Sequence, residues 1–195
     1  MEERHPFKIK NMSKAFIKEF WKDKKMIGSI LPSSKFLAAK MLNHIPLENT
    51  KLIIELGPGT GIFTEKIIEK INASTHLIVL ELNPELCKEL KAKINLPNVH
   101  IKEASADKIG EIMKEFGFEK ADIIISSLPL ANFSEELRNS ILEIVHESLN
   151  EDGSFIQFQY SLNAFKNLKK LFPVVKLNFT ALNFPPAFVY TCSKR

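Results

Sequence analysis

From residue 51 onward, short apolar or β-branched segments alternate along the chain with segments of helical periodicity. This alternation is typical of βα units, which build a mostly parallel sheet with helices on both faces. We expect seven strands, over residues 51–56, 76–82, 99–102, 121–126, 154–160, 174–181 and 187–192. The connection between the last two, Asn183-Phe-Pro-Pro186, is short enough for an antiparallel pair. The sequence therefore predicts an α/β fold whose sheet ends in an antiparallel hairpin.

Two of the helices between these strands have clear start signals. Asn83 precedes Pro84 and an acidic residue, and Ser134 precedes two glutamates. A polar side chain at such a position accepts hydrogen bonds from the first free N–H groups of a helix, and proline fits the first turn. We expect further helices over residues 62–71 and 163–172.

The segment before residue 46 differs from this core. Residues 1–28 hold eight Lys or Arg and four Asp or Glu, whereas residues 29–195 hold nineteen of each, so the net charge of +4 lies near the N-terminus. Within residues 7–27, helical periodicity places lysines on one face and apolar side chains on the other, namely Ile9, Met12, Phe16 and Phe20. We therefore divide the chain into an N-terminal amphipathic helix and lid segment, residues 1–45, and a core domain, residues 46–195.

Composition excludes several classes of protein. Cys87 and Cys192 lie in no Cys-x-x-Cys pair or histidine cluster, so neither a disulfide framework nor a metal site is expected. No signal peptide precedes them, which favours the cytoplasm. No apolar run approaches the roughly 20 residues that cross a bilayer, so we expect no membrane span, while contact with a membrane surface stays open.

Three glycines directly follow the first expected strand and precede a helix. In this context glycines allow a tight turn and let a ligand approach the main chain, although a turn without a ligand has the same pattern. Glu55 stands just before them, and its carboxylate attracts a cation and repels a phosphate. No Lys-Ser or Lys-Thr follows, which excludes a phosphate-binding P-loop. These features predict a site for a sulfonium nucleoside, S-adenosylmethionine, formed by Glu55, Gly57, Pro58, Gly59, Thr60 and Gly61.

The ends of the second and third strands add candidates, because ligands of open α/β sheets bind at the carboxyl edge. Glu81 and Leu82 follow the glycines by about 20 residues, where an acidic side chain accepts hydrogen bonds from ribose hydroxyls. The alternative for Glu81 is an exposed strand-end carboxylate. Ser105 and Ala106 come after the third strand, at the adenine end of the site, and Asp107 is either a substitute acceptor or a helix N-cap.

The fourth strand ends in Ser126-Ser127 followed by Leu128-Pro129-Leu130. Two polar residues and a stiff apolar segment at this edge can present carbonyls and an apolar wall beside a methyl donor. The alternative is a loop with no part in binding. We assign Ser126 to the cofactor.

With these edges placed, the sequence resembles the bacterial phospholipid N-methyltransferases of the soluble, membrane-associating kind and, more distantly, the ribosomal RNA adenine dimethyltransferases. The resemblance covers nearly the whole chain and rests on the segments 20–34, 54–61, 126–130, 153–160 and 183–189. It implies a Rossmann-like class I methyltransferase fold, with S-adenosylhomocysteine as product. The implied substrate is the amine of phosphatidylethanolamine or of a similar aminolipid such as an ornithine lipid. Where related enzymes have Gly-Asp-Ala, Ser105 replaces the aspartate, which leaves the adenine contact open.

The resemblance also implies roles on the substrate side. Tyr160, expected at the end of the fifth strand, would orient the amine or face the developing ammonium with its ring, unless it is a core aromatic. Ser127 is the second catalytic candidate, and Ser33, Ser34 and Leu128-Pro129-Leu130 are the substrate candidates. The basic N-terminal helix would lie on an anionic membrane surface, at the inner face of the membrane, unless it packs on the core. No nucleic acid partner is expected.

Three different functions remain open beside this one. The first is methylation of ribosomal RNA. The ribosomal RNA dimethyltransferases have an Asn-Leu-Pro-Tyr motif, in which the Asn binds the amine and the aromatic ring stacks on the base. Here the corresponding segment Ser127-Leu-Pro-Leu130 lacks both groups. We also expect no C-terminal RNA-binding domain. Asn183-Phe-Pro-Pro186 mimics the motif but precedes the last strand. The second is methylation of a small soluble amine, and the third is cofactor binding without catalysis, for which Ser105 is the only indication.

Overall fold

The computed structural model describes residues 38, 42, 45, 47, 49–180 and 186–195. The chain divides into two compact units, Met1–Leu31 and Pro32–Arg195, and every described residue belongs to the second. The predicted N-terminal helix over residues 7–27, Ser33, Ser34 and most of the connection 183–186 therefore lie outside the described residues.

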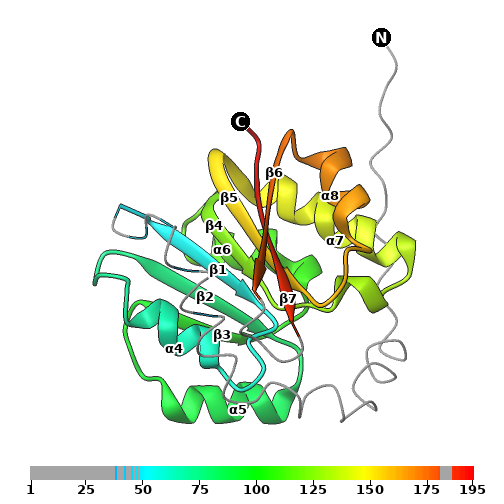
Figure 1. The fold of residues 1–195 in the computed structure, drawn as a ribbon. Helices are drawn as coiled ribbons and strands as arrows, with labels where there is room; N and C mark the ends of the chain where they lie inside the picture. The colour runs from blue at the N-terminus through cyan, green and yellow to red at the C-terminus, as the bar shows by residue number, and fades with distance from the viewer. Residues whose placement is uncertain (1–37, 39–41, 43–44, 46, 48, 181–185) are drawn as a thin grey trace. The chain divides into compact units, whose positions relative to one another are not determined.

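A seven-stranded sheet forms the centre of the second unit, with the strand order β3-β2-β1-β4-β5-β7-β6 (Figure 1). β1 to β5 are parallel to one another, whereas β7 runs antiparallel to both β5 and β6. The strands are β1 Leu52–Leu56, β2 His76–Glu81, β3 Val99–Glu103, β4 Ala121–Ser126, β5 Leu149–Gln159, β6 Val174–Thr180 and β7 Ala187–Ser193. The predicted α/β fold with an antiparallel final hairpin is confirmed.

Helices cover both faces of this sheet (Figure 1). α4 and α5 pack on one face, and α6, α7 and α8 pack on the other. Their bounds are α4 Ile62–Ile68, α5 Pro84–Lys93, α6 Ile109–Glu115, α7 Glu135–Ser148 and α8 Phe165–Leu171, with short 3-10 helices η1 at Ala106–Lys108 and η2 at Leu130–Asn132. Because both faces are covered, every residue of β1 is buried: Ile53 faces the α4–α5 side and Ile54 the other side.

The predicted helix starts are confirmed. The Asn83 side chain accepts hydrogen bonds from the backbone N–H groups of Glu85 and Leu86 at 2.9 and 3.2 Å, and Ser134 Oγ accepts from Leu137 N at 3.3 Å. Each side chain therefore satisfies N–H groups that have no partner within the helix.

Two predictions need correction. β5 begins at Leu149, which pairs with Ala121, rather than at Ser154. The turn-like residues 150–153 form an irregularity within the strand, because the register shifts before Ser154 pairs with Ile123, and Asn150 Nδ2 donates to Asp122 Oδ1 at 2.6 Å. Asp107 is not a helix N-cap, since Ser105 occupies that position and Asp107 lies within η1.

Among the described residues, none of the helices has the length and apolar content that a membrane span requires. The same part of the chain contains no group of three or more His, Cys, Asp and Glu side chains placed to hold a metal ion.

Candidate cofactor and substrate site

The predicted cofactor residues come together at one edge of the sheet. β1 lies between β2 and β4, so the strand order reverses at β1, and ligands of open α/β sheets bind at the carboxyl ends of strands at such a position. The segments that follow β1, β2, β3 and β4 all start at this edge, because these four strands are parallel.

The turn after β1 depends on its glycines. Gly57, Gly59 and Gly61 have φ angles of 68°, 58° and 88°, in the left-handed region that favours glycine. A Cβ atom on Gly57 would lie 2.9 Å from Leu128 Cδ2, and one on Gly61 would collide with Leu90, whereas one on Gly59 would meet no atom within 4 Å. The turn is therefore packed at both ends and open at Gly59, where a ligand can approach the main chain.

Glu55 is fully buried at the end of β1. Neither of its carboxylate oxygens has a hydrogen bond partner among the described residues, and the same holds for the neighbouring Thr64 hydroxyl. Burial raises the pKa of Glu55 to about 8; the Thr64 hydroxyl lowers it, and the nearby Glu81 raises it. A buried carboxyl without a partner is costly unless a cation lies beside it, so this position suits the ammonium end of S-adenosylmethionine and opposes a phosphate.

Glu81 holds the glycine turn against β2. Its Oε2 accepts a hydrogen bond from Gly59 N at 3.0 Å, and its Oε1 accepts from Asn83 N at 2.8 Å. Burial raises its pKa, and the backbone N–H groups of Asn83, Gly59 and Leu82 lower it. Only 1% of Glu81 is exposed, which excludes the alternative of an exposed strand-end carboxylate. A carboxylate offers about four acceptor positions, so two remain for the predicted ribose hydroxyls.

The edge after β3 provides the predicted adenine end. Ser105 Oγ is buried and has no hydrogen bond partner among the described residues, and the adjoining Ala106 is buried. A hydroxyl in this state has both donor and acceptor capacity left, which is compatible with an adenine edge.

The loop after β4 lies directly beside the glycine turn. Ser127 N donates to Leu56 O at 3.0 Å, and Leu128 packs on Gly57. Ser126 is buried, and its Oγ accepts from Leu128 N at 3.2 Å; Ser127 Oγ is buried without a partner among the described residues. Leu128 and Pro129 are half-buried, whereas Leu130 is fully buried in the core and supports the loop by packing.

The residues that hold this loop in place were not predicted from the sequence. The side-chain amides of Gln157 and Gln159 on β5 both donate to the Leu128 carbonyl, at 3.0 and 2.9 Å, and Gln159 Oε1 accepts from Ala131 N at 3.2 Å. Arg138 of α7 donates from Nε to Leu130 O at 2.8 Å. Two glutamines alternate with apolar residues in a strand that is expected to be buried, and buried amides need hydrogen bond partners, so this pattern could have indicated their role.

Tyr160 comes directly after β5 rather than within it. Its ring stands edge-to-face on Phe158 with centroids 4.8 Å apart, and 40% of the residue is exposed. It is therefore not a core aromatic, and its ring is partly exposed at the carboxyl edge of the sheet.

The fold and the site define a class I methyltransferase, an enzyme whose cofactor is S-adenosylmethionine. The defining features are a mostly parallel seven-stranded sheet with an antiparallel final strand, a glycine turn after β1, and buried acids at the ends of β1 and β2. Residues 10–160 match the profile of the ribosomal RNA adenine dimethylase family, and the chain belongs to that family.

Individual relatives differ in what they methylate. The chain is 31% identical over 179 residues to an ornithine lipid N-methyltransferase of Singulisphaera acidiphila, with 91% of this chain and 93% of that protein covered. It is 26% identical to the ribosomal RNA small subunit methyltransferase A of Ureaplasma urealyticum, with 86% of this chain but 65% of that protein covered. The fold matches a SAM-dependent methyltransferase from Aquifex aeolicus with a TM-score of 0.66, 14% identity and coverage of 87% and 97%. The protein is thus a relative of lipid N-methyltransferases within this family.

Proposed function

We propose that the protein methylates the amine of an aminolipid, such as phosphatidylethanolamine or an ornithine lipid, at the membrane surface. The observation that carries this proposal is the similarity to an ornithine lipid N-methyltransferase along nearly the full length of both chains. On this proposal the protein works peripherally at the inner face of the membrane, with its N-terminal helix on anionic lipid.

The residues of the site fit the two reactants. The cofactor supplies a methyl group bound to a cationic sulfur. Glu55 would hold its ammonium end, Glu81 its ribose and Ser105 its adenine, with the main chain open at Gly59. Transfer then requires that the amine nitrogen lie in line with the methyl group and the sulfur, which is chiefly a matter of positioning.

Ser127 and Tyr160 are the groups proposed to position the amine. Ser127 Oγ is a buried acceptor at the end of β4, beside the glycine turn. It would accept an N–H of the substrate amine. Tyr160 would stabilise the ammonium that develops during transfer with the face of its ring. Leu128 and Pro129 would form the apolar wall between them.

The methylation of ribosomal RNA is the competing function, since the matched family and one relative carry that name. The β4 loop opposes it. Ser127 offers a short hydroxyl where an amide is expected, and Leu130 is buried in the core, so it is not available to stack on an extruded base.

The test is methyl transfer from labelled S-adenosylmethionine to vesicles that contain phosphatidylethanolamine or ornithine lipid, with the lipid products identified by mass. We expect the mass of one of these lipids to increase in equal steps, one for each hydrogen of the amine that a methyl group replaces. The Ser127→Ala variant should lower the rate without weakening cofactor binding. Transfer to small-subunit ribosomal RNA or to a soluble amine, with none to either lipid, would refute the proposal.

A further inference from the structure

The last part of the chain has a one-sided charge distribution. Residues 153–195 contain no Asp or Glu and six Lys or Arg. Two of these cations are paired with acids from the β5 hairpin: Lys194 with Glu151 at 3.4 Å and Arg195 with Asp152 at 3.3 Å. The other four, which are Lys166, Lys169 and Lys170 on α8 and Lys176 on β6, form no ion pair with any described residue. The cations of α8 and β6 are therefore not neutralised by described acids, and three of them lie together on α8.

Exposed apolar side chains gather in the same part of the chain. Five large hydrophobic residues are exposed among those that the structure describes, and four of them fall between residues 160 and 179: Tyr160, Leu162, Leu177 and Phe179, with 40%, 47%, 40% and 53% exposed. The fifth, Leu96, lies far away in sequence, after α5. A concentration of exposed apolar side chains in one region indicates an interaction surface.

The topology places this apolar surface beside the candidate site. β6 is the edge strand, and it is parallel to β5 because both run antiparallel to β7. Its carboxyl end therefore lies at the same edge of the sheet as the cofactor residues. In register, Phe179 pairs with Phe188, and Phe188 pairs with Gln159 at the end of β5. Phe179 and Leu162 thus stand at the substrate side of the site.

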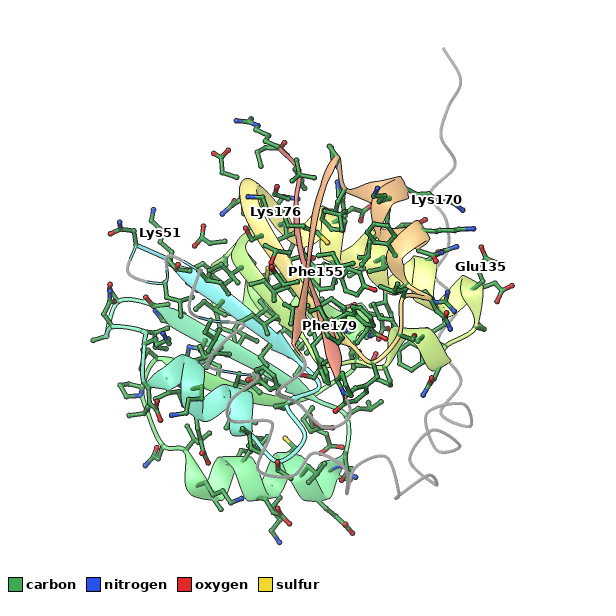
Figure 2. All side chains as sticks on the ribbon, viewed as in Figure 1. Lys51, Glu135, Phe155, Lys170, Lys176 and Phe179 are labelled. Carbon is green, nitrogen blue, oxygen red and sulfur yellow. The ribbon has the colours of Figure 1, made fainter. Side chains whose placement is uncertain are left out.

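Helix α8 supplies the charge next to these residues. Its exposed positions are Lys166, Lys169 and Lys170, spaced three and four apart and hence on one side of the helix, while Asn167 and Leu168 are buried. Lys169 Nζ lies 4.7 Å from the centroid of the Phe165 ring. Figure 2 shows Lys170 on α8 and Lys176 and Phe179 along β6. Lysines and exposed apolar side chains thus occur together on two elements that contact each other.

We propose that this surface, the α8–β6 face, docks on an anionic membrane; it consists of Lys166, Lys169, Lys170, Leu162, Leu177 and Phe179. The lysines meet anionic headgroups, and the apolar side chains enter the boundary between headgroups and acyl chains. Docking in this way brings the carboxyl edge of β4 and β5 to the depth of a lipid headgroup. The use of this surface in catalysis rests on the proposed lipid function, whereas the docking itself does not.

An RNA partner fits this face less well. RNA is bound through its phosphates by cations and through its bases by aromatic stacking. Leu162 and Leu177 contribute to neither interaction, yet they are among the most exposed apolar side chains of the described residues. Aliphatic side chains beside lysines that form no ion pair are instead the combination found on elements that lie in a membrane interface.

The charge test uses the full chain and vesicles of phosphatidylethanolamine and phosphatidylglycerol in a 3:1 ratio. The triple variant Lys166→Glu, Lys169→Glu and Lys170→Glu should sediment with these vesicles at least about tenfold more weakly than the wild type, since each lysine near such a surface contributes about fivefold. The control reverses the same number of exposed lysines on α5, with Lys88→Glu, Lys91→Glu and Lys93→Glu, and should change binding by no more than about threefold. Equal losses in the two variants, or no loss in either, would overturn the proposal.

The apolar test is independent of charge. Leu177→Ser with Phe179→Ser should weaken vesicle binding at high salt, where lysine contributions are screened, and Leu96→Ser should not. Unchanged S-adenosylmethionine binding establishes that each variant is folded. A double variant that binds as well as Leu96→Ser would contradict the insertion of β6.

Labelled small-subunit ribosomal RNA separates the two kinds of partner. If the α8 triple variant loses RNA binding but keeps vesicle binding, the face is an RNA surface and the membrane proposal is wrong. If vesicle binding is lost as expected while the wild type methylates no aminolipid, the docking surface stands and the proposed function fails.

Discussion

At the scale of single residues, Glu55 is the group whose state depends most on its neighbours. Burial raises the pKa of its carboxyl to about 8, so in the free protein at pH 7 it is mostly protonated. An ammonium group beside it favours the carboxylate and lowers this pKa again. Binding of S-adenosylmethionine should therefore be linked to the loss of a proton.

This linkage gives the first prediction. At pH 7, cofactor binding should release up to one proton, and the affinity should fall as the pH is lowered below about 8, because the carboxyl must first ionise. Calorimetry in two buffers of different ionisation enthalpy measures the released proton directly. In Glu55→Gln the release should disappear together with most of the affinity. Wild-type binding that is independent of pH between 6 and about 8 would show that Glu55 does not meet the cationic end.

The same group affects the stability of the free protein. The pKa values of Glu55 and Glu81 are raised on folding, so the folded state binds protons more tightly than the unfolded chain. Stability should then fall as the pH rises from about 4.5 towards about 8, by roughly 1.4 kcal/mol for each unit by which a pKa is raised, as an upper limit. Thermal unfolding in the absence of cofactor should show a smaller slope for Glu55→Gln. A free protein that becomes more stable across this range would contradict the burial of an ionisable Glu55.

The proposed contact of Glu81 with the cofactor can be tested with a matched control variant. Glu81→Ala removes the acceptors for Gly59 N and for the ribose, and should weaken S-adenosylmethionine binding about tenfold to a hundredfold. Glu103 pairs with Glu81 in register at the end of β3 but is exposed, so Glu103→Ala should leave the affinity unchanged. Calorimetric titration compares the two. Unchanged affinity in Glu81→Ala would remove Glu81 from the cofactor site.

Among the secondary-structure elements, β5 and α7 hold the loop between β4 and η2 in place through side-chain hydrogen bonds to its carbonyl groups. Gln157 and Gln159 reach the Leu128 carbonyl, and Arg138 reaches the Leu130 carbonyl. These side chains position the loop without forming the reaction site themselves. Misplacement of a reacting group by about 1 Å can cost a hundredfold in rate, so the effect of these bonds should appear in catalysis rather than in folding alone.

The corresponding prediction concerns Gln159. Gln159→Glu keeps the shape of the side chain but removes the donor to Leu128 O, and should lower kcat on the proposed lipid substrate about tenfold or more with cofactor affinity unchanged. Asn163→Ala, which removes an exposed amide in the segment after β5, should change neither quantity. If Gln159→Glu keeps the wild-type kcat, the bond to Leu128 is not needed to position the loop.

The sequence allowed the sheet to be predicted because β1, β2 and β4 are buried on both faces and therefore consist of continuous apolar runs. Glu55 and Glu81 could be predicted as candidates for the cofactor site because their position at strand ends can be read from the neighbouring sequence alone. The start of β5 was missed because residues 150–153 have the composition of a turn, and only the pairing of Leu149 with Ala121, 28 residues away, extends the strand beyond them. The glutamine contacts were missed for the same reason, since they span about 30 residues.

For the molecule as a whole, we propose two contacts with the membrane: the predicted N-terminal amphipathic helix and the α8–β6 face. Deletion of residues 1–25 should strongly weaken sedimentation with anionic vesicles, because this segment carries the excess of positive charge. The binding that remains should be sensitive to salt and should be lost in the α8 triple variant. Full binding by the truncated chain would leave the N-terminal helix as a packing element.

The proposed choice of a lipid amine over an RNA base can be tested by a competition in one tube. The full chain is given labelled S-adenosylmethionine together with vesicles of aminolipid and phosphatidylglycerol and an equal molar amount of small-subunit ribosomal RNA, and both products are analysed by mass. We predict label in the methylated aminolipid and none in adenine. Label in N6-methylated adenine with unmodified lipid would contradict the proposed methylation of an aminolipid.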